Sequence, residues 1–140
     1  MIRPGDSAAA GFVVQPGDTA QGLAISPDDE FPAVFATSRM VALMELAAAR
    51  VLQPLLQPGE LSVGTVVNVQ HTAATPVGVA VRATATYLGA EGRMHRFRIE
   101  AFDEAGAIGA GDHTRTIIST ERLLKGAARR ARLGAQRKNR

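Results

Sequence analysis

The chain has 140 residues, of which 46% are hydrophobic and 21% charged, a composition typical of one soluble globular domain that can bury a core. It contains no cysteine, which excludes disulfides and thiolate metal sites. No apolar stretch approaches the roughly 20 residues that cross a bilayer, and the N-terminus lacks a signal-peptide pattern. We therefore expect a cytoplasmic protein.

Positive charge is concentrated at the C-terminal end. The chain carries 16 Lys and Arg against 13 Asp and Glu, but eight of the basic residues and one acid lie at 121–140. Residues 1–120 therefore hold eight basic and twelve acidic residues, a net charge of −4. A basic tail can contact nucleic acid or a membrane. This tail has no aromatic side chain to stack on bases, so we expect it to be solvated, with neither nucleic acid nor membrane as a partner.

The N-terminal part is rich in Gly, Pro and Asp, and its pattern predicts one short strand at 11–14. The segment 26–32 is typical of a turn or lid, because it combines two prolines and three acids with Phe31. An apolar helix is predicted at 38–56. Threonine and serine at its start are both possible N-caps, and prolines mark its end.

Four strand-like segments follow the helix and are separated by short turns that contain Gly or Pro. They cover residues 62–75, 78–88, 93–103 and 107–120. A polar helix is predicted to start near Thr120 and to fray in the basic tail. We therefore divide the chain into a domain at 1–120 and a basic C-terminal helix or tail at 121–140.

The order of these elements predicts the fold class. One strand, one apolar helix and four consecutive strands form an α+β pattern. An antiparallel sheet that curls around the single helix would bury it, and this arrangement is the hotdog fold. A half-wrapped sheet leaves an edge strand that can pair across a two-fold axis, so we expect a homodimer.

Glu45 is the one charged residue in the run MVALMELAAA at 40–49. A helix that is apolar on all sides is normally buried, and a buried unpaired charge costs on the order of several kcal/mol. Glu45 is therefore the first candidate for chemistry. The structural alternative is an ion pair with an arginine such as Arg115, since Arg50 lies on a different face of the helix.

His71 is the second candidate. Side chains alternate along a strand, so His71 shares the more apolar, helix-facing side with Val67 and Val69. A lone histidine on such a face is most often a core residue, but here Glu45 needs a partner on the same side. A pair of Glu45 with His71 would supply a group that titrates near neutral pH, as general-base catalysis requires.

Thr37 is the third candidate, although threonine before a helix is usually a cap. A hydroxyl at a helix N-terminus, beside free backbone N–H groups, can also hold an anion or a carbonyl oxygen. Thr37 and Glu45 are ~12 Å apart if both lie in one straight helix. Direct contact would require Thr37 on a loop that folds back. Otherwise His71 bridges the two residues, or the site uses both subunits.

Other motifs give little support for metal or nucleotide chemistry. The three histidines are scattered, without HxxxH or HxH spacing, and no Walker loop, GxGxxG loop or G-x-S-x-G nucleophile elbow is present. His95 lies at a predicted strand start beside two arginines, and His113 shares a strand face with Arg115. We expect no metal.

Three segments resemble the fluoroacetyl-CoA thioesterase family, and the run H-T-A-A-T-P is specific. They are FPAVFATSRMVALMELAAARVLQPLLQPGE at 31–60, SVGTVVNVQHTAATPVG at 62–78 and GAGDHTRTII at 109–118. The resemblance implies a dimeric hotdog hydrolase that cleaves acyl-CoA thioesters without a cofactor, because CoA arrives with the substrate. It implies a threonine, a glutamate and a histidine as catalytic residues, at Thr37, Glu45 and His71.

The resemblance also assigns three substrate-binding positions. Gly64 matches a glycine whose backbone lies close to the substrate carbonyl. Phe31 matches an aromatic residue of the lid over the pocket, and Arg115 matches an arginine near the site. The segment before Phe31 is shorter and more acidic than the family pattern, so a general short-chain acyl-CoA is the expected substrate.

Two other functions compete with hydrolysis. A hotdog enoyl-CoA hydratase would usually carry an Asp and a His in one short motif near the helix start, and residues 31–45 contain nothing similar. The other alternative is a non-catalytic protein that binds acyl-CoA or regulates a partner, tethered through its basic tail.

Overall fold

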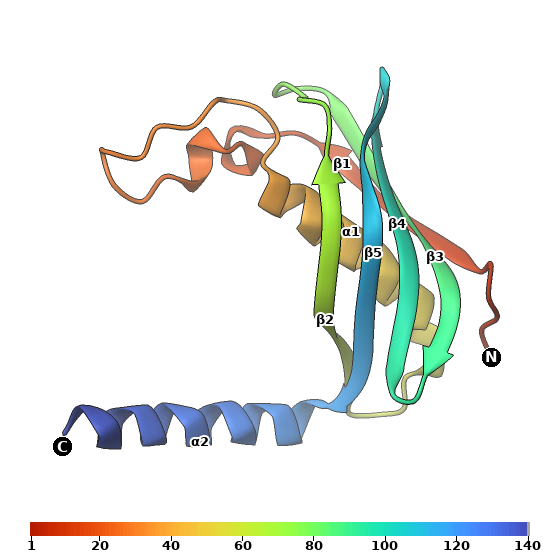
Figure 1. Ribbon diagram of the computed structural model, residues 1–140, viewed down its shortest axis with the longest axis vertical. Helices are drawn as coiled ribbons and strands as arrows, with labels where there is room; N and C mark the ends of the chain where they lie inside the picture. Colours follow the sequence, from red (N-terminus) through yellow and green to blue (C-terminus); the bar gives the residue numbers. More distant parts are fainter. Residues whose placement is uncertain (140) are drawn as a thin grey trace.

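The computed structural model describes residues 1–139, and Arg140, the last cation of the tail, lies outside the described residues. Five strands form one antiparallel sheet in the spatial order β1-β3-β4-β5-β2. The strands are β1 (Ser7–Val13), β2 (Glu60–His71), β3 (Ala80–Glu91), β4 (Met94–Asp103) and β5 (Gly106–Ser119). The sheet curls around α1 (Thr37–Leu52), as predicted, and α2 (Thr120–Lys138) projects from its end (Figure 1).

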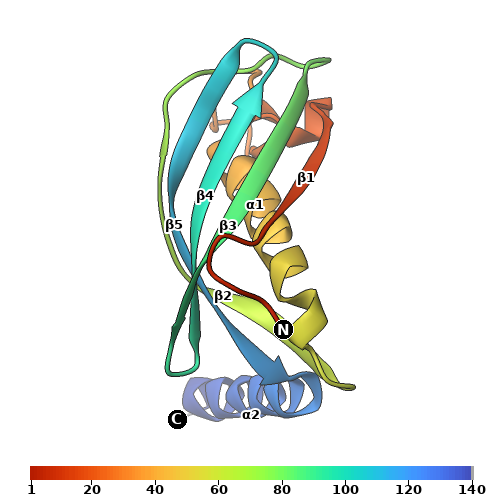
Figure 2. The ribbon, with the colours of Figure 1, turned by 90° about the vertical axis from the view of Figure 1, so that its right-hand side faces the viewer.

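One face of α1 forms the centre of the core, because its apolar residues recur at helical spacing. The buried residues of the helix are Met40, Leu43, Met44, Ala47, Ala48, Val51 and Leu52. The prediction that this run is buried on all sides is wrong for the single chain: Leu46 is 46% exposed and the side chain of Glu45 is 38% exposed. The sheet covers only one side of the helix and leaves the other side open (Figure 2).

The elements next to the helix differ slightly from the predicted ranges. The α-helix ends at Leu52, and the short 3₁₀ turn Gln53–Leu55 follows, because Pro54 cannot continue an α-helix. β2 ends at His71 rather than at residue 75. Beyond it Thr75 is buried, where its hydroxyl donates to the Asp103 carboxylate at 2.7 Å.

β2 forms one edge of the sheet and pairs, within residues 1–139, only with β5. A β-bulge shifts the register between Gly64 and Val66. Val66 and Val67 point to opposite faces of the strand, yet both are exposed, at 55% and 39%. A long edge strand with apolar side chains on both faces offers a surface for pairing with another strand.

The basic tail is helical. Ser119 caps α2 by accepting a hydrogen bond from the Arg122 backbone N–H at 3.3 Å, and Glu121 pairs with Lys125 one turn later at 2.8 Å. The prediction that the tail frays is wrong, since the helix continues to Lys138. No helix within the described chain is long and apolar enough to cross a membrane.

Candidate active site

The candidate residues fall into two separate clusters within the chain. Thr37 and His71 lie together where α1 begins and β2 ends. Glu45 lies two turns along α1, where it meets Arg115 of β5. Gly64 of β2 lies against the second cluster.

The first cluster rests on a hydrogen bond between Oγ1 of Thr37 and Nδ1 of His71, which lie 2.9 Å apart. Thr37 does not cap the helix, because Ala36 occupies the N-cap position and no side chain caps this end. The backbone N–H of Ala36 donates instead to the carbonyl oxygen of Asp18 at 2.9 Å. This connection holds the start of α1 in place and leaves the hydroxyl of Thr37 free for His71.

The imidazole of His71 combines burial with an unused nitrogen. Its Nε2 is buried and has no hydrogen-bond partner within residues 1–139. Burial lowers the pKa of His71, and the backbone of Ala73 partly opposes this effect. The imidazole is therefore neutral at neutral pH and can accept a proton. If the hydroxyl of Thr37 donates to Nδ1, Nε2 carries the hydrogen; in the other tautomer Nε2 is the free base.

A shallow cavity of about 340 Å³ adjoins this first cluster. Thr37 and His71 line it together with small and apolar residues, among them Phe35. Phe31, the predicted lid residue, is not part of this lining and is 51% exposed, on a segment that projects from the body before α1 (Figure 1). Pro32, the last residue of the lid segment, does line the cavity, so the segment borders the cavity without placing Phe31 in it.

The second cluster is organised around the guanidinium group of Arg115, which is only 6% exposed. Its Nη1 donates to Oε1 of Glu45 at 3.1 Å. Its Nε donates to the hydroxyl of Ser62 at 3.0 Å, and its Nη2 donates to the backbone carbonyl of Ser62 at 2.9 Å. All three nitrogens of the group are bonded, so the guanidinium holds the carboxylate in one position.

His113 completes this cluster and was not selected from the sequence. Its Nδ1 lies 2.7 Å from the carbonyl oxygen of Val66, which can only accept, so Nδ1 carries the proton. Its Nε2 then accepts from Nη1 of Arg115 at 3.2 Å. Burial lowers the pKa of His113, which keeps the ring neutral. The sequence signal that could have identified His113 was its shared strand face with Arg115.

Gly64 allows this cluster to pack closely. It lies opposite Arg115 in the register of β2 and β5. A Cβ atom added at Gly64 would overlap the carboxylate of Glu45 and would lie 3.0 Å from Cε1 of His113. Glycine is therefore the residue that leaves room for Glu45 against the strand.

The predicted pair of Glu45 with His71 does not form within one chain. Arg115, the structural alternative, is the partner of Glu45, and Thr37 is the partner of His71. The reason is their separation along β2: His71 lies seven residues beyond Gly64, ~23 Å in a strand. Residues 1–139 contain no group of three or more His, Asp or Glu side chains placed to bind an ion.

Comparisons with known proteins identify the family. The family model described as fluoroacetyl-CoA-specific thioesterase matches residues 14–121. A fluoroacetyl-CoA thioesterase from Streptantibioticus cattleyicolor is 46% identical over 124 residues, which cover 87% of this chain and 89% of the relative. A solved structure of the fluoroacetyl-CoA thioesterase FlK is similar with a TM-score of 0.87 and 43% identity, covering 92% of this chain and 97% of that one.

A more distant solved structure extends the likeness to the whole chain. It is a thioesterase superfamily member from Thermus thermophilus, with a TM-score of 0.82 and 30% identity over 100% of this chain and 98% of that one. The fold is therefore the hotdog fold that the order of elements predicted. The chain belongs to the fluoroacetyl-CoA thioesterase family and is a thioester hydrolase.

Proposed function

We propose that the protein hydrolyses a short-chain acyl-CoA to the free acid and CoA, with Thr37, Glu45 and His71 as the catalytic residues. The observation that carries this proposal is the Thr37–His71 hydrogen bond, which leaves a buried imidazole nitrogen unused beside a small cavity. Relatives are named for fluoroacetyl-CoA. The resemblance to these relatives supports a short acyl group as the substrate of this chain.

Two routes are open, and in both neutral His71 accepts a proton from water and passes it to the sulfur of CoA. In the first route, Glu45 orients a water molecule that attacks the thioester carbonyl while His71 takes the water proton and delivers it to the sulfur as the C–S bond breaks. In the second route, the Glu45 carboxylate attacks the carbonyl and CoA leaves as the thiolate. Water then hydrolyses the resulting anhydride, and His71 transfers the proton of this water to the CoA thiolate. Thr37 positions the substrate or the water, and backbone N–H groups near Gly64 polarise the carbonyl.

The two clusters would complete one site only across a homodimer. β2 is an exposed edge strand, so two copies can pair antiparallel through it. A two-fold axis between Val67 and Asn68 would bring His71 opposite the partner subunit's Gly64. Thr37 and His71 of one subunit would then face the partner's Glu45, which resolves their separation within a chain.

Mixed dimers test this arrangement. The variants His71→Ala and Glu45→Gln are each expected to be inactive as homodimers. Co-expressed with different tags and purified as a heterodimer, they should regain activity, because one of the two sites then receives both intact residues. If each site were built within one subunit, every site in the heterodimer would carry a substitution and no activity would return.

The direct test of the function is a panel of acyl-CoAs (acetyl, fluoroacetyl, propionyl, butyryl, hexanoyl and phenylacetyl) with release of free CoA as the readout. We expect turnover of at least one short member and its loss in Glu45→Gln. The proposed reaction needs no added metal or organic cofactor, and we propose that the enzyme acts in the cytoplasm. Tight CoA binding without turnover would instead favour the non-catalytic alternative.

A further inference from the structure

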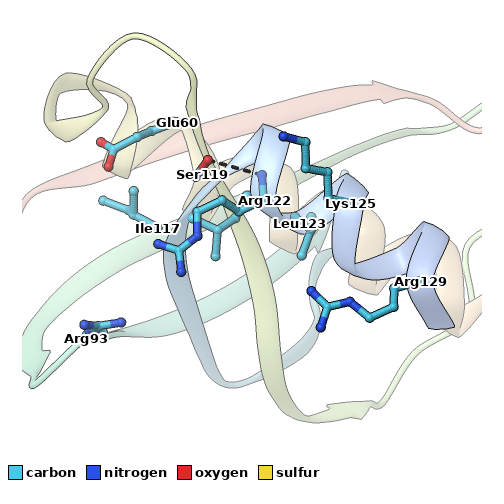
Figure 3. A pocket seen from close by; sticks show the side chains of 9 residues that line it. Glu60, Arg93, Ile117, Ser119, Arg122, Leu123, Lys125 and Arg129 are labelled. Carbon is cyan, nitrogen blue, oxygen red and sulfur yellow. Dashed lines mark hydrogen bonds between the residues drawn. The ribbon is translucent and has the colours of Figure 1, made fainter.

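A second cavity, of about 870 Å³, lies between α2 and the end of the sheet. Four cationic side chains line it. Three of them, Arg122, Lys125 and Arg129, come from α2, and Arg93 comes from the turn between β3 and β4 (Figure 3). We refer to this cavity as the basic groove.

The charges of the basic groove are poorly neutralised by the protein. Glu60 is the one carboxylate in its lining, and one of its oxygens already accepts the backbone N–H of Gln57 at 2.8 Å. Lys125 pairs with Glu121 on the exposed side of the helix at 2.8 Å. Among residues 1–139, the ion pairs include none with the three arginines of the groove.

The spacing of the helical cations explains why they act together. Lys125 and Arg129 follow Arg122 by three and seven residues, so the three side chains lie on one face of α2. Like charges on one helix face repel each other and destabilise the free helix. An anion bound between them would remove this cost, since guanidinium and ammonium groups form their strongest hydrogen bonds with phosphate and carboxylate oxygens.

Part of the groove continues the face of the sheet that carries the second cluster. In the register of β2 and β5, Arg115 lies opposite Gly64. The next two inward-facing positions of β5 are Ile117 and Ser119. They lie opposite Ser62 and Glu60 of β2. Ile117 and Ser119 both line the groove, and so does Ile118 from the opposite face, so the groove extends around this end of β5. Ile117 and Ser119 lie ~7 and ~13 Å beyond Arg115 along β5. An extended molecule with its reacting end at Glu45 could therefore run along this face into the groove.

We propose that the basic groove binds the phosphate groups of the CoA part of the substrate. A CoA thioester carries its reacting carbonyl at one end of a flexible pantetheine arm, and a diphosphate and a 3′-phosphate at the other end. The groove supplies cations for these phosphates, and apolar Ile117 and Leu123 lie beside them. The inference rests on the proposed function, and it assigns α2 a role in substrate binding apart from the chemistry.

The test compares two charge-matched variants. One replaces the three groove cations of α2 (Arg122→Gln, Lys125→Gln and Arg129→Gln). The control replaces three cations further along the helix that do not line the groove (Arg132→Gln, Arg137→Gln and Lys138→Gln). Each variant is assayed with a short acyl-CoA and with the corresponding acyl-pantetheine thioester, which lacks every phosphate.

We expect the groove variant to raise KM for acyl-CoA about tenfold, with kcat unchanged, because three exposed charge contacts with the phosphates are lost. Its KM for acyl-pantetheine should equal that of the wild type, and the control should behave as wild type with both substrates. The inference is overturned if KM for acyl-CoA is unchanged in the groove variant. An equal rise for both substrates, or the same effect in the control, also overturns it.

Binding of free CoA, measured by calorimetry, separates this inference from the proposed function. If the wild type cleaves neither thioester, hydrolysis fails but the groove is still tested. CoA binding that weakens about tenfold in the groove variant and not in the control supports the groove. Equal binding by all three proteins, or no binding by the wild type, overturns it.

Discussion

The two clusters of the site differ in how fully their hydrogen-bonding groups are used. In the second cluster Arg115, His113 and Ser62 all have partners, so the carboxylate of Glu45 is held in one arrangement. In the first cluster His71 has one partner, Thr37, and a buried Nε2 with none in the described chain. Buried polar atoms without partners are rare in folded proteins. The comparison indicates a firmly positioned carboxylate in the second cluster and an unused imidazole nitrogen in the first, and the proposed reaction needs both.

Removing the imidazole should have the largest effect. We expect His71→Ala to lower kcat by ~10²-fold or more, because the variant lacks the general base. The free energy of unfolding should change by only about 1 kcal/mol, since a single hydrogen bond is lost. Steady-state hydrolysis and urea unfolding of the same preparation measure both effects. Turnover close to wild type would remove His71 from the chemistry.

Disturbing the second cluster should instead lower stability. Gly64→Ala places a Cβ against the Glu45 carboxylate and His113, so the carboxylate has to move away from its hydrogen bond with Arg115. We expect a loss of about 1–3 kcal/mol in the free energy of unfolding, together with a lower kcat.

The matched control is Gly126→Ala in α2, where an added Cβ meets no atom within 4 Å. This change should be neutral or slightly stabilising, because alanine is the better helix former. Equal stabilities of the two variants would show that Glu45 is free to move.

The pH dependence of stability probes the buried histidines of both clusters. Burial lowers the pKa of His71 and of His113 below the ordinary value of 6.5, and it lowers the pKa of His95 on β4 in the same direction. The unfolded chain therefore binds more protons than the folded chain once the pH falls below 6.5, so the free energy of unfolding decreases there. Urea unfolding at about pH 7.5 and about pH 5.5 measures this loss. His113→Gln should make this decrease in the free energy of unfolding smaller. If the decrease is as large as in the wild type, His113 does not contribute to it.

Much of this fold follows from the order and periodicity of the elements. The apolar run that ends at Leu52 and the four strands after it are sufficient to indicate a curled sheet around one helix. Strand alternation also places His71 correctly on the face of Val69, which packs against the core. The type of each element and the alternation of side chains along a strand depend on residues close together in the sequence, so they can be predicted from it.

The pairing within the site could not be predicted in the same way. The alternation of side chains along β2 predicts the face on which His71 lies. It does not predict which residue of β2 lies next to Glu45 of α1. That position depends on how the whole helix packs on the sheet, so the choice between His71 and Arg115 as the partner of Glu45 stayed open. His113 was overlooked because its role depends on the carbonyl of Val66, on a different strand.

Thr37 allows the finest distinction between support and chemistry, because its hydroxyl lies at the start of α1 and also meets His71. An N-cap threonine changed to alanine typically costs about 1 kcal/mol. Thr37 is not the cap, so Thr37→Ala should lose only the hydrogen bond to His71 and lower the free energy of unfolding by about 1 kcal/mol or less, as His71→Ala does, while hydrolysis is strongly reduced. Thr37→Ser keeps the hydroxyl that meets His71 and should retain most of the activity. If Thr37→Ala instead loses stability and activity in proportion, Thr37 supports the start of α1, and the first cluster reduces to His71 alone.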